Sequence, residues 1–182
     1  WGMRDSKGEE REDGRIIRKF DIKNRDGLSG NMMEIRRIEL LVEGQKKDFD
    51  VEIDLRKGDK LQIVGPNGIG KTTFFNLIGK SGAKGIKINE GIKIGYYRQD
   101  FTTLDFNNSA YEELAKVFKR LDDHHLRSTA AGFLLGGKEL AHKVGHLSEG
   151  QKGLLMWAYL TLLEPGILII DEPTNHINFR HI

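Results

Sequence analysis

The chain has 182 residues, of which 38% are hydrophobic and 31% are charged, and its formal net charge at pH 7 is +2. This length and composition suit one globular domain with its own core, and the small charge neither demands nor excludes a nucleic-acid partner. The absence of cysteine excludes disulfide and thiolate chemistry, and no apolar run approaches the roughly 18 residues that would span a bilayer.

The first thirty residues are rich in charge and poor in apolar anchors. Residues 1–14 indicate a tail or the end of a linker, and residues 15–22 indicate a short extended segment. Trp1-Gly2-Met3 leads directly into charged residues, which is not the pattern of a secretory signal, and a start at Trp1 indicates a fragment. We therefore expect residues 1–30 to be a charged tail or linker end and residues 31–182 to form one domain.

Short apolar runs predict strands on both sides of a glycine-rich loop. Apolar and acidic residues alternate over Phe49–Leu55, which is the period of a half-buried strand. Leu61–Val64 is mostly apolar, so we expect it to be a strand inside a sheet that leads into the loop, and residues 72–78 to be the helix that follows. Further strands are expected at residues 33–42, 86–88, 92–94 and 167–170.

Two capping boxes predict where helices begin in the second half of the chain. Ser109 and Ser148 each stand three residues before a Glu or Gln, the spacing at which the two side chains satisfy each other's backbone N–H groups. We expect the second of these helices to end at Glu164, because a residue that precedes proline is pushed out of the helical region, and we expect Trp157 to lie in the core. The helices are expected at residues 109–121, 126–135 and 148–163, the middle one ending at Gly136-Gly137.

The glycine-rich loop has the P-loop pattern, in which a glycine and four further residues precede Gly-Lys-Thr. Glycines let successive N–H groups converge on phosphate oxygens, and the following helix adds its positive dipole end. Lys71 can bind the β- and γ-phosphates, Thr72 can ligate Mg²⁺, and Thr73 can reach the α-phosphate. The alternative is a plain glycine turn with a solvated lysine. The candidate nucleotide-binding residues are Gly65, Pro66, Asn67, Gly68, Ile69, Gly70, Lys71, Thr72 and Thr73.

Two adjacent acids follow the apolar run Ile167–Ile170. Ligands of open α/β sheets bind beyond the carboxyl ends of the strands, so these acids and the glycine loop can meet at one edge. Asp171 would then hold Mg²⁺ through water, and Glu172 would polarise the water that attacks the γ-phosphate of ATP. The alternative is a pair of solvated acids at a strand end.

The run Leu147-Ser148-Glu149-Gly150-Gln151 resembles the signature motif of ABC-type ATPases, and Gln99 in residues 96–100 resembles their Q-loop. With the glycine loop and the acids, four motifs occur in the order of that family. The resemblance implies an α/β P-loop NTPase of ABC type. Such a fold has a parallel-rich core sheet, an antiparallel β subdomain and an inserted helical subdomain, here at about residues 101–164.

The resemblance also implies roles for the remaining motifs. Ser148, Gly150 and Gln151 would bind the γ-phosphate of an ATP molecule held by a partner domain, and the alternative for Ser148 is a plain helix cap. Gln99 would contact Mg²⁺ and act in catalysis beside Lys71 and Glu172, and the alternative is a surface residue after a strand.

Residues 171–176 narrow the resemblance further, because Asn175-His176 after Asp-Glu-Pro-Thr is typical of the ABC-F class. That class has no membrane domain and acts in translation on the ribosome. The resemblance implies that this chain is the second ATPase domain of a longer cytoplasmic protein, truncated at its C-terminus before the switch histidine. Its expected partners are a second ABC domain in the same chain, or a dimer mate, and the ribosome with tRNA.

Besides ending before the switch histidine, the chain departs from the family pattern at three places. Glu149 replaces a signature glycine, Asn178 stands where the D-loop aspartate is usual, and no aromatic residue between Phe20 and Phe49 is available to stack on adenine. Because the same core serves ABC membrane transporters, the ATP-binding subunit of a transporter is one alternative. Asn178 and the missing aromatic residue favour a second, a nucleotide-binding switch with little turnover. Whichever function holds, we expect slow ATP hydrolysis by the isolated chain.

Overall fold

The computed structural model describes residues 30–171 with the exception of 43, 66–67, 80–83 and 119–121. These residues form two compact units, which we call the sheet unit (30–96 with 165–171) and the helical unit (97–164). The tail and the extended segment expected before residue 30 lie outside the described residues. No helix within the described part of the chain is long and apolar enough to cross a membrane.

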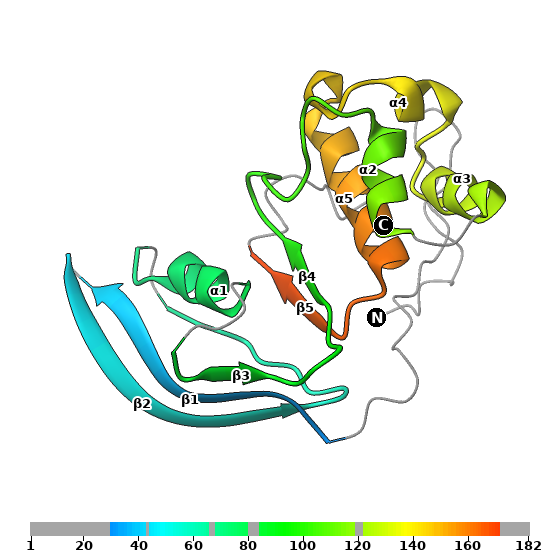
Figure 1. The fold of residues 1–182 in the computed structure, drawn as a ribbon. Helices are drawn as coiled ribbons and strands as arrows, with labels where there is room; N and C mark the ends of the chain where they lie inside the picture. Colours follow the sequence, from blue (N-terminus) through cyan, green and yellow to red (C-terminus); the bar gives the residue numbers. More distant parts are fainter. Residues whose placement is uncertain (1–29, 43, 66–67, 80–83, 119–121, 172–182) are drawn as a thin grey trace, which may run out of the picture. The chain divides into compact units, whose positions relative to one another are not determined.

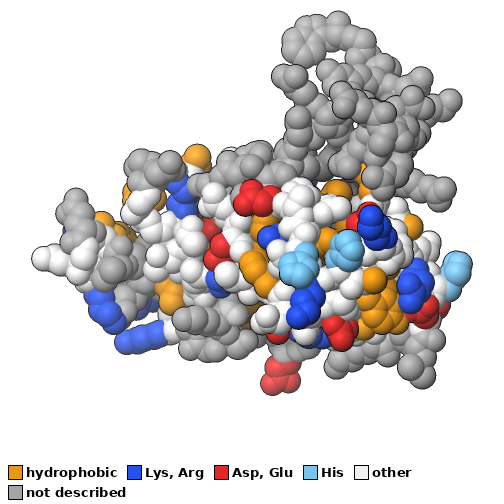
Figure 2. Space-filling view, turned by 90° about the horizontal axis from the view of Figure 1, so that it is seen from above, with side chains coloured by type: hydrophobic (Ala, Val, Ile, Leu, Met, Phe, Trp, Pro, Cys, Tyr) orange, Lys and Arg blue, Asp and Glu red, His pale blue; other side chains and the backbone are white. Residues whose placement is uncertain are grey.

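Charged side chains of both signs lie on the face of the molecule shown in Figure 2. On the face shown in Figure 2, basic, acidic and histidine side chains stand among uncharged ones and do not gather by sign. Two exposed ion pairs are examples. A guanidinium nitrogen of Arg36 lies 2.6 Å from a carboxylate oxygen of Asp54, and one of Arg127 lies 2.7 Å from a carboxylate oxygen of Asp123. Pairs of this kind contribute little to stability, so most of this charge serves to solvate the surface.

The sheet unit is built on a long antiparallel hairpin of β1 (Asn31–Val42) and β2 (Gln45–Arg56), with β3 (Ile86–Ile88) on the other side of β1 (Figure 1). The strands expected at 33–42, 49–55 and 86–88 are therefore confirmed. β2 starts four residues earlier than the apolar alternation does, because its ladder with β1 continues through polar residues to the pair Val42 and Gln45.

The second, two-stranded sheet contains β4 (Ile94–Tyr97) and β5 (Ile167–Ile170), whose arrows point the same way in Figure 1. Lys93 O accepts hydrogen bonds from the N–H groups of Gly166 and Ile167 at 2.9 and 3.2 Å, which aligns the starts of the two strands. β5 confirms the strand expected at 167–170.

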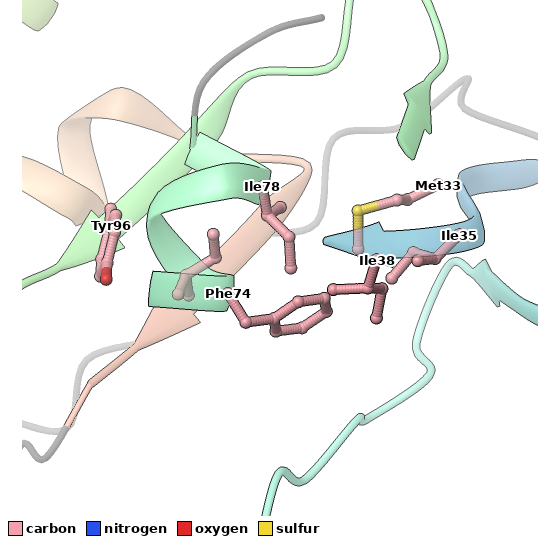
Figure 3. Close-up of a cluster of buried hydrophobic side chains, with 7 residues drawn as sticks. Met33, Ile35, Ile38, Phe74, Ile78 and Tyr96 are labelled. Atoms are coloured by element: carbon pink, nitrogen blue, oxygen red, sulfur yellow. The ribbon is translucent and has the colours of Figure 1, made fainter. Parts of the chain in front are cut away.

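One helix and both sheets share a core in the sheet unit (Figure 3). The helix α1 (Lys71–Gly79) confirms the helix expected at 72–78 and buries Phe74 and Ile78. β1 contributes three side chains to this cluster, and β4 and β5 contribute one each. The buried members are Met33, Ile35, Ile38, Phe74, Ile78, Tyr96 and Ile169.

Two strand predictions in this unit were wrong. Residues 61–64 form no strand, and Val64 is 83% exposed. An apolar run becomes a strand only when a neighbouring backbone completes its ladder, and no described strand pairs with this run. The strand expected at 92–94 begins only at Ile94, because Ile92 closes a turn by donating its N–H to Asn89 O at 3.3 Å.

The helical unit consists of short helices around one long helix. In chain order these are α2 (Ala110–Val117), α3 (Asp123–Gly132), α4 (Gly137–Ala141), a 3₁₀ turn η1 (Val144–His146) and α5 (Glu149–Leu163). Helices α2 and α3 both pack on α5. Trp157 of α5 is buried, as predicted, and so is Leu154, three residues before it on the same face of the helix.

The ends of these helices differ from the predictions. α2 ends at Val117 rather than near Leu121, because Phe118 is already extended. α3 starts three residues earlier than expected, since the Asp122 carboxylate accepts the His125 N–H at 3.0 Å. The middle helix was expected to reach residue 135 and stop at Gly136-Gly137, but α3 ends at Gly132. Gly137 instead starts α4, because the Glu139 carboxylate accepts the Gly136 N–H at 3.0 Å.

Candidate nucleotide-binding site

The described part of the glycine loop has the backbone that a phosphate cradle needs. Gly68 and Gly70 have φ values of +83° and +101°, which L-residues with a side chain rarely adopt. A Cβ atom at either position would meet nothing within 4 Å, so glycine is required by the backbone conformation and not by lack of space. Pro66 and Asn67 lie outside the described residues.

The start of α1 favours an anion in front of the loop. Phe74 N donates to Gly70 O at 2.9 Å, so the helical hydrogen bonds begin directly at the loop. The first turn contains no acidic residue, and Thr72 and Thr73 are exposed there. The helix dipole and the unsatisfied N–H groups of this turn together attract negative charge.

Lys71 folds over the same loop. Its ammonium group donates a hydrogen bond to Gly65 O at 2.7 Å. This contact holds the positive charge within reach of any ligand that the loop cradles. The arrangement therefore places a cation, backbone donors and a helix N-terminus around one position, which fits the phosphates of a nucleotide.

Asp171 follows β5 and belongs to the same unit as the loop. It is 6% exposed. Ile169 of β5 lies in one cluster with Phe74 and Ile78 of α1, so the strand that delivers Asp171 and the helix that begins with Lys71 share a core. Its carboxylate and the Thr72 hydroxyl are oxygen donors of the type that Mg²⁺ prefers. Glu172 lies outside the described residues.

Gln99 is exposed in a turn between two buried aromatic anchors of the helical unit. Tyr97 packs against Trp157 of α5 with ring centroids 4.9 Å apart, and meets Phe101 in a T-shaped contact with centroids 6.1 Å apart. Burial raises the pKa of Tyr97 to about 12, so its phenol stays neutral at ordinary pH. Phe101 N donates to Arg98 O at 3.2 Å and closes the turn. The anchors fix the position of Gln99 relative to α5.

Asp100 stiffens the same turn. Its carboxylate accepts hydrogen bonds from the Thr102 N–H at 3.1 Å and from the Thr102 hydroxyl at 2.8 Å. Burial opposes ionisation of this carboxyl, but the Thr102 bonds and the charge of Arg98 outweigh it and hold its pKa below the usual range. Asp100 is therefore ionised near neutral pH and continues to hold the turn.

The signature-like run caps the N-terminus of α5, as predicted. Ser148 Oγ accepts the Gln151 N–H at 3.2 Å, and Gln151 Oε1 accepts the Ser148 N–H at 3.0 Å. Ser148, Glu149 and Gly150 are exposed. Ser148 Oγ accepts its capping hydrogen bond from within the helix, while the residue itself stays exposed. The capping role is therefore compatible with a ligand in front of the helix.

The cap itself makes a measurable prediction. Changing Ser148→Ala removes the acceptor of the Gln151 N–H and should lower the free energy of unfolding by about 1 kcal/mol. Urea denaturation followed by circular dichroism measures this difference. Ser128→Ala is the matched control, since Ser128 is exposed inside α3 and the change there should be neutral or slightly stabilising. Equal losses in both variants would contradict the cap.

The structure divides the predicted site residues between the two units. The loop residues and Asp171 share the sheet unit, whereas Gln99 and the signature residues belong to the helical unit. In the sheet unit are Gly65, Gly68, Ile69, Gly70, Lys71, Thr72, Thr73 and Asp171, and in the helical unit are Gln99, Ser148, Gly150 and Gln151.

Sequence reasoning missed one buried acid of the helical unit. Glu113 of α2 is 1% exposed. It stands three residues after Ala110 and directly before Leu114, both buried, so it occupies a core position of the helix. The signal that could have revealed it is a charged residue at a position where the helical period predicts an apolar one.

The fold and these motifs define the class of the protein as an ABC-type ATPase domain with a P-loop NTPase fold. The family model described as ABC transporter matches residues 49–175, and the chain belongs to this family. The fold class expected from the sequence is thereby confirmed.

Curated relatives support the narrower resemblance to the ABC-F class. The chain is 35% identical over 138 residues to mouse ATP-binding cassette sub-family F member 3, covering 74% of this chain and 19% of the relative. It is 30% identical over 163 residues to YdiF of Bacillus subtilis, covering 87% of this chain and 25% of the relative. The chain thus spans a quarter or less of the length of these relatives.

Solved structures share the fold. The dimeric ATP-binding cassette MJ0796, in a post-hydrolysis state bound to ADP and Pi, matches with a TM-score of 0.62 at 23% identity, covering 81% of this chain and 76% of that one. A chain of ribosome-bound archaeal Pelota and ABCE1 matches with a TM-score of 0.60 at 25% identity, covering 94% of this chain and 30% of that one.

Proposed function

We propose that this chain is the ATP-binding and ATP-hydrolysing domain of an ABC-F type, ribosome-associated translation factor. The observation that carries the proposal is the shared core of α1, which begins with Lys71 behind the glycine loop, and β5, which ends at Asp171. The sub-family F relatives and the ribosome-bound ABCE1 neighbour support the assignment to translation.

In this proposal the sheet unit binds the phosphates of ATP. Loop N–H groups and the Lys71 ammonium hold the β- and γ-phosphates, and Thr73 contacts the α-phosphate. Lys71 exchanges its bond to Gly65 O for bonds to phosphate oxygens. The Thr72 hydroxyl and the Asp171 carboxylate, with Gln99, would hold Mg²⁺, which neutralises charge on the phosphates.

Hydrolysis is assigned to a water molecule that Glu172 orients and deprotonates, with Gln99 contacting the same water and Lys71 stabilising the charge that develops on the γ-phosphate. Ser148, Gly150 and Gln151 would complete the site of a partner ABC domain, because the exposed N-terminus of α5 offers donors to its ATP. The isolated chain should accordingly turn over ATP slowly.

The proposal extends to the layout of the longer protein. Residues 31–182 would form one ABC domain, the second of two, with the helical subdomain at about 101–164 inserted into it. Residues 1–30 would be the end of the linker from the first domain. The second ABC domain, the ribosome and tRNA are the proposed partners, and the cytoplasm is the proposed location.

Co-sedimentation with ribosomes tests the proposal. The full-length protein carrying Glu172→Gln should keep ATP bound, remain in its ATP-closed form and pellet with ribosomes through a sucrose cushion. Omitting ATP, or adding Lys71→Ala to the same variant, should return the protein to the supernatant. These two controls separate ATP-dependent binding from adsorption.

A locked variant that binds ATP and stays in the supernatant would contradict the translation role. Tight co-purification with a membrane-spanning protein would instead favour the transporter subunit, whose ATP-binding cassettes share this fold. Tight ATP binding with negligible turnover by the full-length protein would favour a nucleotide-binding switch.

A further inference from the structure

The loop before the signature motif is held in place by a second loop of the helical unit. Gly145 N donates to Phe106 O at 3.0 Å, Val144 N donates to Asn108 O at 2.9 Å, and Ala110 N donates to His142 O at 3.0 Å. We call these two segments, residues 106–110 and 142–145, the clasp. A Cβ atom on Gly145 would lie 3.1 Å from Phe106 O, so a side chain at this position would crowd the Phe106 carbonyl.

The clasp leads directly into the N-terminus of α5. His146 N donates to Lys143 O at 2.9 Å and Leu147 N donates to Val144 O at 3.1 Å, which forms the 3₁₀ turn immediately before the Ser148 cap. Val144 and Leu147 are buried. A single tight turn separates the clasp from the cap, so a shift of the clasp would move the first turn of α5.

One buried side chain fastens the clasp to α2. Glu113 Oε1 accepts a hydrogen bond from Asn108 Nδ2 at 2.7 Å, and Lys116 Nζ reaches the same carboxylate oxygen at 2.5 Å. Asn108 is also the residue whose carbonyl accepts the Val144 N–H. A chain of contacts therefore runs from Glu113 through Asn108 to Val144, from the core of the unit to the edge of the signature motif.

Placing a carboxylate at a site that is 1% exposed is energetically unfavourable by itself. Burial of a charged group is unfavourable unless that group is paired and hydrogen-bonded, and an apolar side chain of similar volume would satisfy the packing. Glu113 also interacts electrostatically with α5. The pKa of Tyr159 on that helix is raised, first by burial and second by the negative charge of Glu113. What the carboxylate supplies, and an apolar residue cannot, is a directional bond to the clasp.

We propose that Glu113 is a positioning residue for the nucleotide-facing end of α5, acting through Asn108 and the clasp. It touches no nucleotide itself. It sets where Ser148 and Gly150 stand, and so how well they can meet an ATP molecule held by a partner domain. The functional part of this inference rests on the function proposed above.

Hydrogen exchange in the nucleotide-free protein tests the positioning directly. In Glu113→Leu and in Asn108→Ala, the amides of Val144 and Gly145 should exchange about tenfold faster, the factor expected when one hydrogen bond to a charged group is lost. Amides in the middle of α5 should keep their protection. Glu113→Gln can still accept from Asn108 and should show a smaller change. Asn107→Ala, at the exposed neighbour of Asn108, is the matched control and should change nothing.

Kinetics of the full-length protein test the functional consequence. In Glu113→Leu and Asn108→Ala, kcat for ATP should fall about tenfold, while ATP affinity at the Lys71 loop should stay within about twofold, because only the signature face is displaced. Unchanged exchange at Val144 and Gly145 in both variants, or faster exchange with unchanged kcat, would overturn the inference. A wild-type protein that binds no ATP would refute the proposed function, and the exchange measurement would still decide whether Glu113 holds the clasp.

Discussion

Replacing Lys71 with alanine should weaken ATP binding by at least about a hundredfold. The side chain supplies the only cation that the structure places directly on the described part of the glycine loop, with its ammonium group 2.7 Å from Gly65 O. Hydrogen bonds from a charged donor to phosphate oxygens contribute about 1.5–3 kcal/mol each, and about 2.7 kcal/mol corresponds to a hundredfold change in the dissociation constant. Titration calorimetry with ATP measures the loss.

Lys87→Ala provides the control for this experiment. Lys87 is an exposed lysine in the middle of β3, in the same compact unit, so it tests the general effect of removing one positive charge. We expect less than a twofold change in affinity there, since surface charges at a distance are screened by salt. Similar losses in the two variants would mean that ATP binds through overall charge and not at the glycine loop.

The features that the sequence alone could predict are those that depend on neighbours in the chain. The capping boxes at Ser109 and Ser148 need only residues three positions apart, and both form as expected. The glycine loop and the helix behind it are likewise local, because Gly68 and Gly70 need particular φ values and the helix follows directly. These short-range signals predicted the local structure around most of the candidate site residues.

The features that the sequence missed depend on contacts between distant segments. Leu61–Val64 has the composition of a strand, but strand formation depends on a partner that composition does not reveal. The clasp joins residues more than thirty positions apart, and Glu113 is buried because Asn108 and Lys116 satisfy its charge. Periodicity could indicate that Glu113 faces the core, but not which groups would meet it there.

The same distinction between local signals and distant contacts explains why the sequence did not reveal that the predicted site residues lie in two units. Strand ends at one sheet edge predict that Lys71 and Asp171 lie near each other, and α1 and β5, which carry them, bury apolar side chains in one cluster. The order of the motifs along the chain carried no information about which unit would hold Gln99. Its anchors, Tyr97 and Phe101, pack in the helical unit, and Tyr97 does so through the ring of Trp157, sixty residues away.

The second large effect that we expect is a loss of stability when the core between α1 and β5 is disrupted. Changing Phe74→Ala should lower the free energy of unfolding by about 3–5 kcal/mol, since a buried aromatic ring is lost and surrounding side chains relax only partly into the cavity. Phe74 is 5% exposed and lies in the cluster with Ile38 and Ile78 (Figure 3). Such a loss is a large fraction of the stability of a typical domain, and urea denaturation measures it.

Phe49→Ala is the matched control, because Phe49 of β2 is 42% exposed and already contacts water over much of its ring. Its loss should cost less than about 1 kcal/mol. Measuring ATP binding by Phe74→Ala as well as its unfolding distinguishes an effect on stability from an effect on binding. Phe74 lies one turn after Lys71 and its side chain is buried in the core cluster. At a temperature where it remains folded, Phe74→Ala should therefore bind ATP within a few-fold of wild type. Equal destabilisation by the two changes would mean that α1 does not depend on this core.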